Sequence, residues 1–186
     1  IKIDNLKSFC KENKISTLGL SDTSNMCGAL EFAENISKVG TQPIIGTQIY
    51  FKFDDTIGLL PLIALNQKGY KRIIELSSKS FLENDLLSDP HLDINELLID
   101  TEGVVVLSGT IHGLFGKLFD KGRFVEIKKL YKSLSSNFDD RFYLEIQRHG
   151  DQNEISFEKF NLDLSHKLNI AIIATNEVYY LTSDMH

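Results

Sequence analysis

Polar side chains stand at or just beyond the carboxyl ends of several predicted strands. They are Asp22, Thr23, Gln48 (within its strand), Ser108, Thr110, Glu145, Asn176 and Glu177. In α/β folds the carboxyl ends of parallel strands meet at one edge or mouth, where active sites are commonly built. We therefore expect a polar site at one end of an α/β sheet or barrel.

The side chains in this set are poorly suited to holding a metal cluster. Zinc and manganese are bound by His, Asp, Glu or Cys at close range. The carboxylates Asp22, Glu145 and Glu177 qualify, whereas Thr23 and the other hydroxyl and amide groups are weak ligands. The set favours a polar site that lacks a working metal centre.

The elements that must position these residues alternate between strand and helix. Short apolar runs predict strands, and apolar residues at helical spacing predict helices. The strands are expected at 16–20, 43–53, 57–65, 104–107, 142–146 and 170–174, and the helices at 3–11, 26–39, 66–76, 94–98, 124–135 and 153–168. The run 57–65 is apolar almost throughout, as expected for a strand buried on both faces. Alternating strands and helices predict a parallel α/β sheet or barrel.

Composition limits the classes of protein to which the chain can belong. Its 186 residues are 42% hydrophobic and 25% charged, which is typical of one globular domain. A net charge of −6 with scattered Lys and Arg argues against a large nucleic-acid surface. Cys10 and Cys27 are too few for a disulfide framework or a four-cysteine zinc site, so we expect both to be reduced and buried in a cytoplasmic protein.

Four stretches in order resemble one known family. Residues 21–29 read Ser-Asp-Thr-Ser-Asn-Met-Cys-Gly-Ala, where the family typically has Thr-Asp-His-Gly-Asn-Met-Phe-Gly-Ala. The others are Pro-Ile-Ile-Gly at 43–46, Phe-Tyr-Leu-Glu-Ile-Gln-Arg-His-Gly at 142–150 and Ala-Thr-Asn-Glu-Val-Tyr-Tyr-Leu at 174–181. Together they identify the chain as similar, over its whole length, to the polymerase and histidinol phosphatase (PHP) domain of bacterial DNA polymerase III alpha subunits.

This resemblance implies a distorted seven-stranded α/β barrel like the TIM barrel. The family begins with a strand that carries His-x-His, and none of the six predicted strands matches it. We therefore expect residues 1–186 to be a single PHP domain whose first strand lies upstream of residue 1. The palm, fingers and later domains of the polymerase would also lie outside this sequence.

The resemblance also implies what became of the metal site. Family members that keep their metals, zinc or manganese, have a different residue at six of the corresponding positions. They have histidine at Thr23, glutamate at Gln48, histidine at Leu59, commonly cysteine at Thr110, and histidine at Tyr179, whereas Asp22 and Glu145 match and Glu177 replaces aspartate. Losing even a residue that only hydrogen-bonds to a metal ligand typically lowers metal affinity about 10- to 100-fold. We therefore expect a vestigial site with no metal, cofactor or catalytic residue. His149 is expected to be hydrogen-bonded rather than a ligand.

The function that follows from the resemblance is structural. The parent would be a cytoplasmic DNA-directed DNA polymerase, a nucleotidyltransferase that uses magnesium and binds DNA through its other domains. This domain would stabilise it and offer a docking surface to the proofreading exonuclease subunit and other replicase subunits. The alternative is an active metal-dependent 3′–5′ exonuclease or pyrophosphatase, in which metals activate water. A free-standing barrel enzyme of unrelated chemistry is a third hypothesis.

Overall fold

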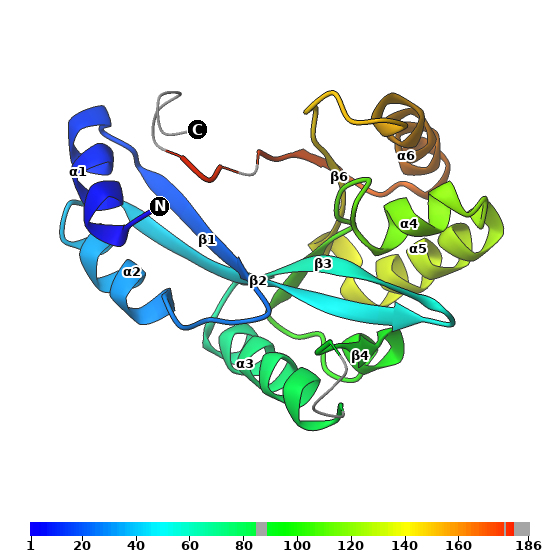
Figure 1. Cartoon of the computed structure of the whole chain (residues 1–186), viewed down its shortest axis with the longest axis horizontal. Helices are drawn as coiled ribbons and strands as arrows, with labels where there is room; N and C mark the ends of the chain where they lie inside the picture. The colour runs from blue at the N-terminus through cyan, green and yellow to red at the C-terminus, as the bar shows by residue number, and fades with distance from the viewer. Residues whose placement is uncertain (85–88, 177, 181–186) are drawn as a thin grey trace.

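The computed structural model describes residues 1–84, 89–176 and 178–180 (Figure 1). The strands in this part are β1 (Thr17–Thr23), β2 (Gln42–Phe53), β3 (Thr56–Ala64), β4 (Leu92–Asp93), β5 (Val104–Leu107), β6 (Phe142–Ile146) and β7 (Ile172–Ala174). The helices are α1 (Ile3–Asn13), α2 (Ala29–Ser37), α3 (Gln67–Leu82), α4 (Leu114–Asp120), α5 (Phe124–Phe138) and α6 (Glu154–Leu168), with the 3-10 helices η1 (Ile94–Leu98) and η2 (Asp139–Arg141). All six predicted strands are present, and the short β4 was missed.

The strands form one curled sheet in the order β1-β2-β3-β5-β6-β7, with β4 beside β2. The pairs β1–β2, β5–β6 and β6–β7 are parallel, but β3 is antiparallel to both β2 and β5. The expectation of a parallel sheet is therefore wrong for β3. The reason is the two-residue connection Asp54–Asp55, because a turn this short can join only antiparallel strands.

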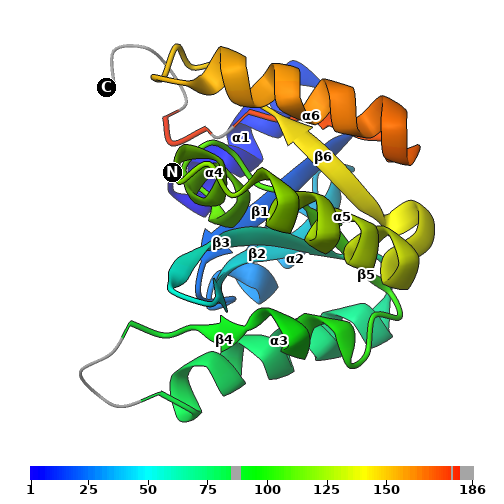
Figure 2. The same ribbon diagram turned by 90° about the vertical axis from the view of Figure 1, so that its right-hand side faces the viewer.

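The sheet curls into a half-barrel with helices on its outer side (Figures 1 and 2). Helices α1 and α2 flank β1 and β2, α3 runs along β2 and β3, α4 packs against β3, and α5 and α6 lie beside β5 and β6. Within the described residues, β1 pairs with β2 alone and β7 with β6 alone, so the barrel is open between β1 and β7. The fold is thus a distorted, open α/β barrel.

The hydrophobic core lies between the sheet and the outer helices. Large side chains such as Leu60, Leu62, Phe115 and Tyr131 are fully buried there. A smaller cluster under α1 and α2 contains Cys10, Phe32 and Ile36. Along β3 buried residues alternate with half-buried ones, so its inner face is not fully buried as the sequence predicted.

Some side chains predicted to be buried are exposed. Helix α2 begins at Ala29 rather than near residue 26, which turns Leu30 outward with 70% of its surface exposed. Ile74 of α3 is also exposed, and Arg72 is buried instead. Cys10 is buried as predicted, but the prediction was wrong for Cys27, which lies exposed in the turn before α2. No helix of the described residues is long and apolar enough to cross a membrane.

Candidate functional site at the mouth of the half-barrel

Thr23 and Gln48 lie side by side at the mouth. They are register partners on the parallel strands β1 and β2, and Gln48 is opposite Pro61 on β3. Register partners point to the same face of a sheet. The Ser24 N–H donates to the Gln48 carbonyl oxygen over 2.7 Å, which fixes this end of β1 against β2. The structure therefore brings these two predicted positions together.

Asp22 lies on the other face of the sheet. β1 continues through Thr23, and successive side chains of a strand alternate between its faces. Asp22 shares its face with Leu18 and Leu20, which pack against α1 and α2. Its Oδ2 lies 3.5 Å from the position that a Cβ on Gly28 would take. The structure therefore separates Asp22 from Thr23.

Leu59 and Thr110 meet through the loop that follows β5. Leu59 occupies the inner face of β3, and its carbonyl oxygen lies within 3.2 Å of an ideal Cβ on Gly109 and within 2.9 Å of one on Gly113. Thr110 lies between these glycines, and its Oγ1 accepts a hydrogen bond of 3.3 Å from the His112 N–H. The two predicted positions are thus neighbours, but an alkyl group and a hydroxyl are not a metal-binding pair.

Glu145 is buried, with 5% of its surface exposed. Its Oε1 accepts hydrogen bonds from the Thr175 hydroxyl and, over 3.2 Å, from Gln147 Nε2. Its backbone N–H donates to Ser108 Oγ over 2.9 Å. This carboxylate is therefore held by hydroxyl and amide groups of the chain itself.

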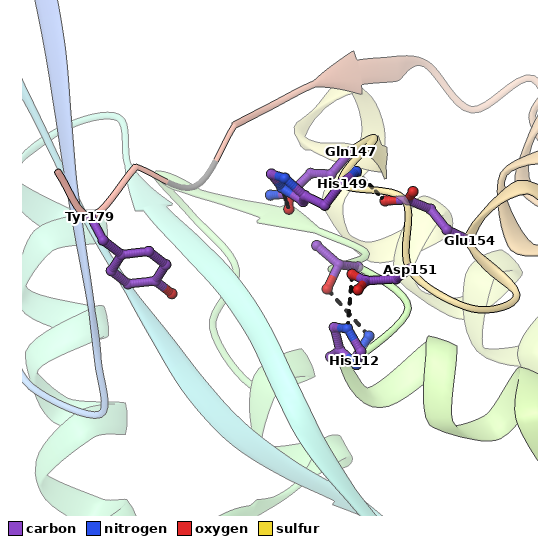
Figure 3. A pocket seen from close by; sticks show the side chains of 7 residues that line it. His112, Gln147, His149, Asp151, Glu154 and Tyr179 are labelled. Carbon is purple, nitrogen blue, oxygen red and sulfur yellow. Dashed lines mark hydrogen bonds and ion pairs between the residues drawn. The ribbon is translucent and has the colours of Figure 1, made fainter. Parts of the chain in front are cut away.

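A pocket of about 250 Å³ (Figure 3) opens at the loop after β6, where Gln147 donates to Glu145 Oε1. Its lining residues come from the loops after β5 and β6, the start of α6 and the segment after β7. They are Thr110, His112, Gln147, His149, Asp151, Glu154 and Tyr179. Tyr179 lies across the pocket from the two histidines in Figure 3. Thr110 and Tyr179, both predicted positions, therefore share this pocket.

The two histidines of the pocket are engaged in hydrogen bonds. His112 Nε2 lies 3.0 Å from Asp151 Oδ2, which links the loop after β5 to the loop before α6. His149 Nε2 lies 3.0 Å from Gln147 Oε1. The prediction that His149 is hydrogen-bonded is confirmed.

Glu154 fixes the loop that carries His149. Its carboxylate accepts the backbone N–H groups of His149 and Gly150, each over 2.8 Å. The His149 N–H is the main cause that holds the pKa of Glu154 below its usual value, because a hydrogen bond to a carboxylate favours its charged form. Next to it, Arg148 makes a two-pronged ion pair with Glu158, with 2.9 and 2.8 Å between donors and oxygens. The loop is thus held from the start of α6.

The described side chains at the mouth do not gather into a metal-binding group. Within residues 1–84, 89–176 and 178–180, no three His, Cys, Asp or Glu side chains gather closely enough to hold an ion. Asp22 lies on the opposite face of the sheet, and Glu145 Oε1 accepts hydrogen bonds from Thr175 and Gln147. Glu177, the remaining carboxylate of the predicted set, lies outside the described residues. The absence of a bound metal remains a prediction.

Sequence reasoning missed several residues that shape the mouth. Gln147 could have been found, because it lies two residues after Glu145 and so shares its side of the chain as the strand ends. Thr175 and the His112–Asp151 pair gave no such signal, since their positions depend on strand register and on how two distant loops meet.

Comparisons with known proteins agree with this architecture. A model of the PHP family, described as "PHP domain", matches residues 1–149. The alpha subunit of DNA polymerase III from Vibrio cholerae is 33% identical over 90% of this chain, that from Caulobacter vibrioides 31% over 97%, and that from Haemophilus influenzae 32% over 99%. This chain spans only 15% to 16% of the length of those relatives.

A solved structure shows the same fold. A protein from Bifidobacterium adolescentis, described as a metal-dependent phosphoesterase, superimposes with a TM-score of 0.56 over 93% of this chain and 80% of its own, at 11% identity. At that identity the likeness concerns the fold alone. The family match over most of the chain, and the open α/β barrel that carries it, show that this protein belongs to the PHP domain family.

Proposed function

We propose that this chain is the PHP domain of a DNA polymerase III alpha subunit and that it serves the polymerase as a structural part rather than as an enzyme. The observation that supports the loss of activity most directly is the state of Glu145. The Oε1 atom of this matched carboxylate accepts hydrogen bonds from Thr175 and Gln147. Thr23, Gln48 and Leu59 surround the mouth with a hydroxyl, an amide and an alkyl group.

The parent protein would be a DNA-directed DNA polymerase, a nucleotidyltransferase of the bacterial cytoplasm. The support for this is the similarity to alpha subunits over 90% or more of this chain. Magnesium and DNA would be bound by its other domains. The net charge of −6 agrees with a domain that does not itself track DNA.

We further propose that this domain offers a docking surface to the proofreading exonuclease subunit, beside other replicase subunits. The resemblance to alpha subunits supports this role. Titration calorimetry of the full-length parent with the purified exonuclease subunit tests it. We expect binding by the parent and weaker or no binding by a parent from which this domain has been deleted. Equal affinity of both would contradict the docking role.

The opening between β1 and β7 is where we propose that a further strand completes the barrel. In the described part, no strand pairs with the outer edge of β1 or of β7, and both run in the same direction as β2, β5 and β6. An unpaired edge exposes backbone N–H and C=O groups that another strand can bind. We expect amides of β1 to exchange more slowly in the parent than in residues 1–186 alone; equal rates would contradict the proposal.

The inactivity of the site is tested separately from docking. We expect purified parent protein, exposed to zinc and manganese and then gel-filtered, to carry less than one equivalent of either ion. It should release no phosphate from a p-nitrophenyl ester and should not degrade DNA from its 3′ end. Two or three retained ions together with nuclease activity would favour the active phosphoesterase instead.

A further inference from the structure

Glu145 connects three neighbouring strands at the point where their backbone ladders end. Ser108 follows β5, Glu145 belongs to β6, and Thr175 follows β7. The β5–β6 register ends at Leu107 with Tyr143, so the bond from Glu145 N–H to Ser108 Oγ extends that pairing by a side chain. On the other side the Thr175 hydroxyl reaches the Glu145 carboxylate beyond the last β6–β7 pair.

Gln147 ties the same group to the loop that follows β6. Its Nε2 donates to Glu145 Oε1 over 3.2 Å and to Thr175 Oγ1 over 2.8 Å. Its Oε1 faces His149 Nε2 at 3.0 Å. The backbone takes part as well, because the Thr175 N–H donates to the Ile146 carbonyl oxygen over 3.1 Å. The three side chains of Glu145, Gln147 and Thr175 thus form a closed triangle of hydrogen bonds.

Burial gives this triangle its structural importance. A buried carboxylate is unfavourable unless hydrogen bonds or a counter-charge replace the water it loses. At 5% exposure Glu145 obtains such bonds from a hydroxyl and an amide. Conversely, the Thr175 hydroxyl and the Gln147 amide direct their protons at that carboxylate, so each member depends on the others.

We propose that Glu145, Thr175 and Gln147 form a metal-independent brace that fixes the end of β7 and the 147–150 loop to the half-barrel. In this brace a hydrogen-bonded carboxylate cross-links strand ends, as a bound ion would in a metal site. The inference rests on the proposed absence of a metal but not on the proposed docking role.

Removal of the Thr175 hydroxyl tests the brace. Thr175→Val keeps the shape of the side chain and removes the hydroxyl that donates to Glu145. Thr41→Val is the control, because it removes a threonine hydroxyl outside the triangle. Thr41 is 2% exposed, and its hydroxyl donates to the Ile15 carbonyl oxygen over 2.7 Å. Hydrogen exchange is measured by mass spectrometry in the full-length parent, in peptides covering 142–150 and 170–176, with 42–53 as reference. We expect Thr175→Val to speed exchange in the first two peptides about 10- to 100-fold, the scale of one hydrogen bond to a charged group, and to leave 42–53 unchanged.

Two results would overturn the brace. One is exchange in Thr175→Val that equals the wild type, or that rises equally in all three peptides. The other is slower exchange at 142–150 in wild-type protein on addition of zinc or manganese, reversed by a chelator, because Glu145 would then be a ligand.

Gln147→Met keeps the proposal testable if Thr175→Val does not fold. It leaves the bond between Thr175 and Glu145 in place, and we expect faster exchange limited to 142–150; no change there would also count against the brace. A failure of the exonuclease subunit to bind would leave all of these rates unchanged. Retained metal, in contrast, would argue against both the brace and the proposed inactivity.

Discussion

Tyr131 of α5 and Asn161 of α6 meet in the core, where the Tyr131 hydroxyl donates a hydrogen bond of 3.0 Å to Asn161 Oδ1. Both residues are 0% exposed. In the described structure Asn161 Nδ2 has no hydrogen-bond partner. The buried amide of Asn161 therefore depends on the hydrogen bond that Tyr131 donates to Oδ1. The pair joins the two helices behind β6, the strand that carries Glu145.

Tyr131→Phe should therefore destabilise the fold by about 1–3 kcal/mol, the cost of leaving a buried polar group without its partner. Urea unfolding of residues 1–186 measures this. Tyr50→Phe is the matched control, because Tyr50 is half-buried on the opposite face of the sheet. A loss of stability no larger than that of the control would show that Asn161 finds another partner.

Gly58 controls how closely α4 approaches β3. A Cβ on this residue would lie 2.4 Å from the backbone N and Cα of Leu114, and backbone atoms can move away only if the helix moves. Gly58→Ala should therefore cost about 1–3 kcal/mol or more, as overpacking does. Amides of the 109–113 loop should exchange faster.

Gly19→Ala is the control for this change, because nothing lies within 4 Å of the added methyl group. In a strand the alanine should be neutral or slightly stabilising. If the two substitutions cost the same in thermal unfolding, the close approach of α4 to β3 is not what Gly58 provides.

Glu154 makes the stability of the 147–150 loop depend on pH. The His149 N–H is the main cause that lowers the pKa of Glu154 in the folded protein. A lowered pKa means that the stabilisation is present above the pKa of the unfolded chain, about 4.3, and is lost as the pH falls. Glu154→Gln should lower the melting temperature at pH 7 and have a smaller effect near pH 3.

The exposed Glu34 provides the control for this comparison. Glu34→Gln should melt like the wild type at both pH values. A difference between wild type and Glu154→Gln that stays constant from pH 7 to pH 3 would show that the carboxylate charge does not hold the loop.

The fold could be predicted from apolar runs, but the site could be predicted only in part. Strands 104–107 and 142–146 are apolar and short, and both appear as expected. Residues 21–23 are polar, so their sequence did not indicate a strand. They belong to β1 because they pair with β2. The opposite faces of Asp22 and Thr23 follow from that extension. The partner of Glu145 depends on the β6–β7 register, which no local pattern encodes.

Thr23 and Gln48 offer a direct test of whether the mouth can regain a metal. As register partners on neighbouring strands they lie about 5 Å apart, so Thr23→His with Gln48→Glu would place two ligand types side by side. Zinc sites in proteins use three or four protein ligands, and Glu145 is engaged elsewhere. We therefore expect the double variant to retain less than one equivalent of zinc after gel filtration.

Adding Leu59→His supplies a third ligand on the inner face of β3, and we expect zinc retention to rise in this triple variant. The control moves the histidine to Ser21, which has the same orientation but pairs with Gly46, two register positions from the Thr23–Gln48 pair. Ser21→His with Gln48→Glu and Leu59→His should retain less zinc than the triple variant. Stoichiometric zinc in the double variant would contradict this expectation, because it would mean that a further side chain of the mouth completes the site.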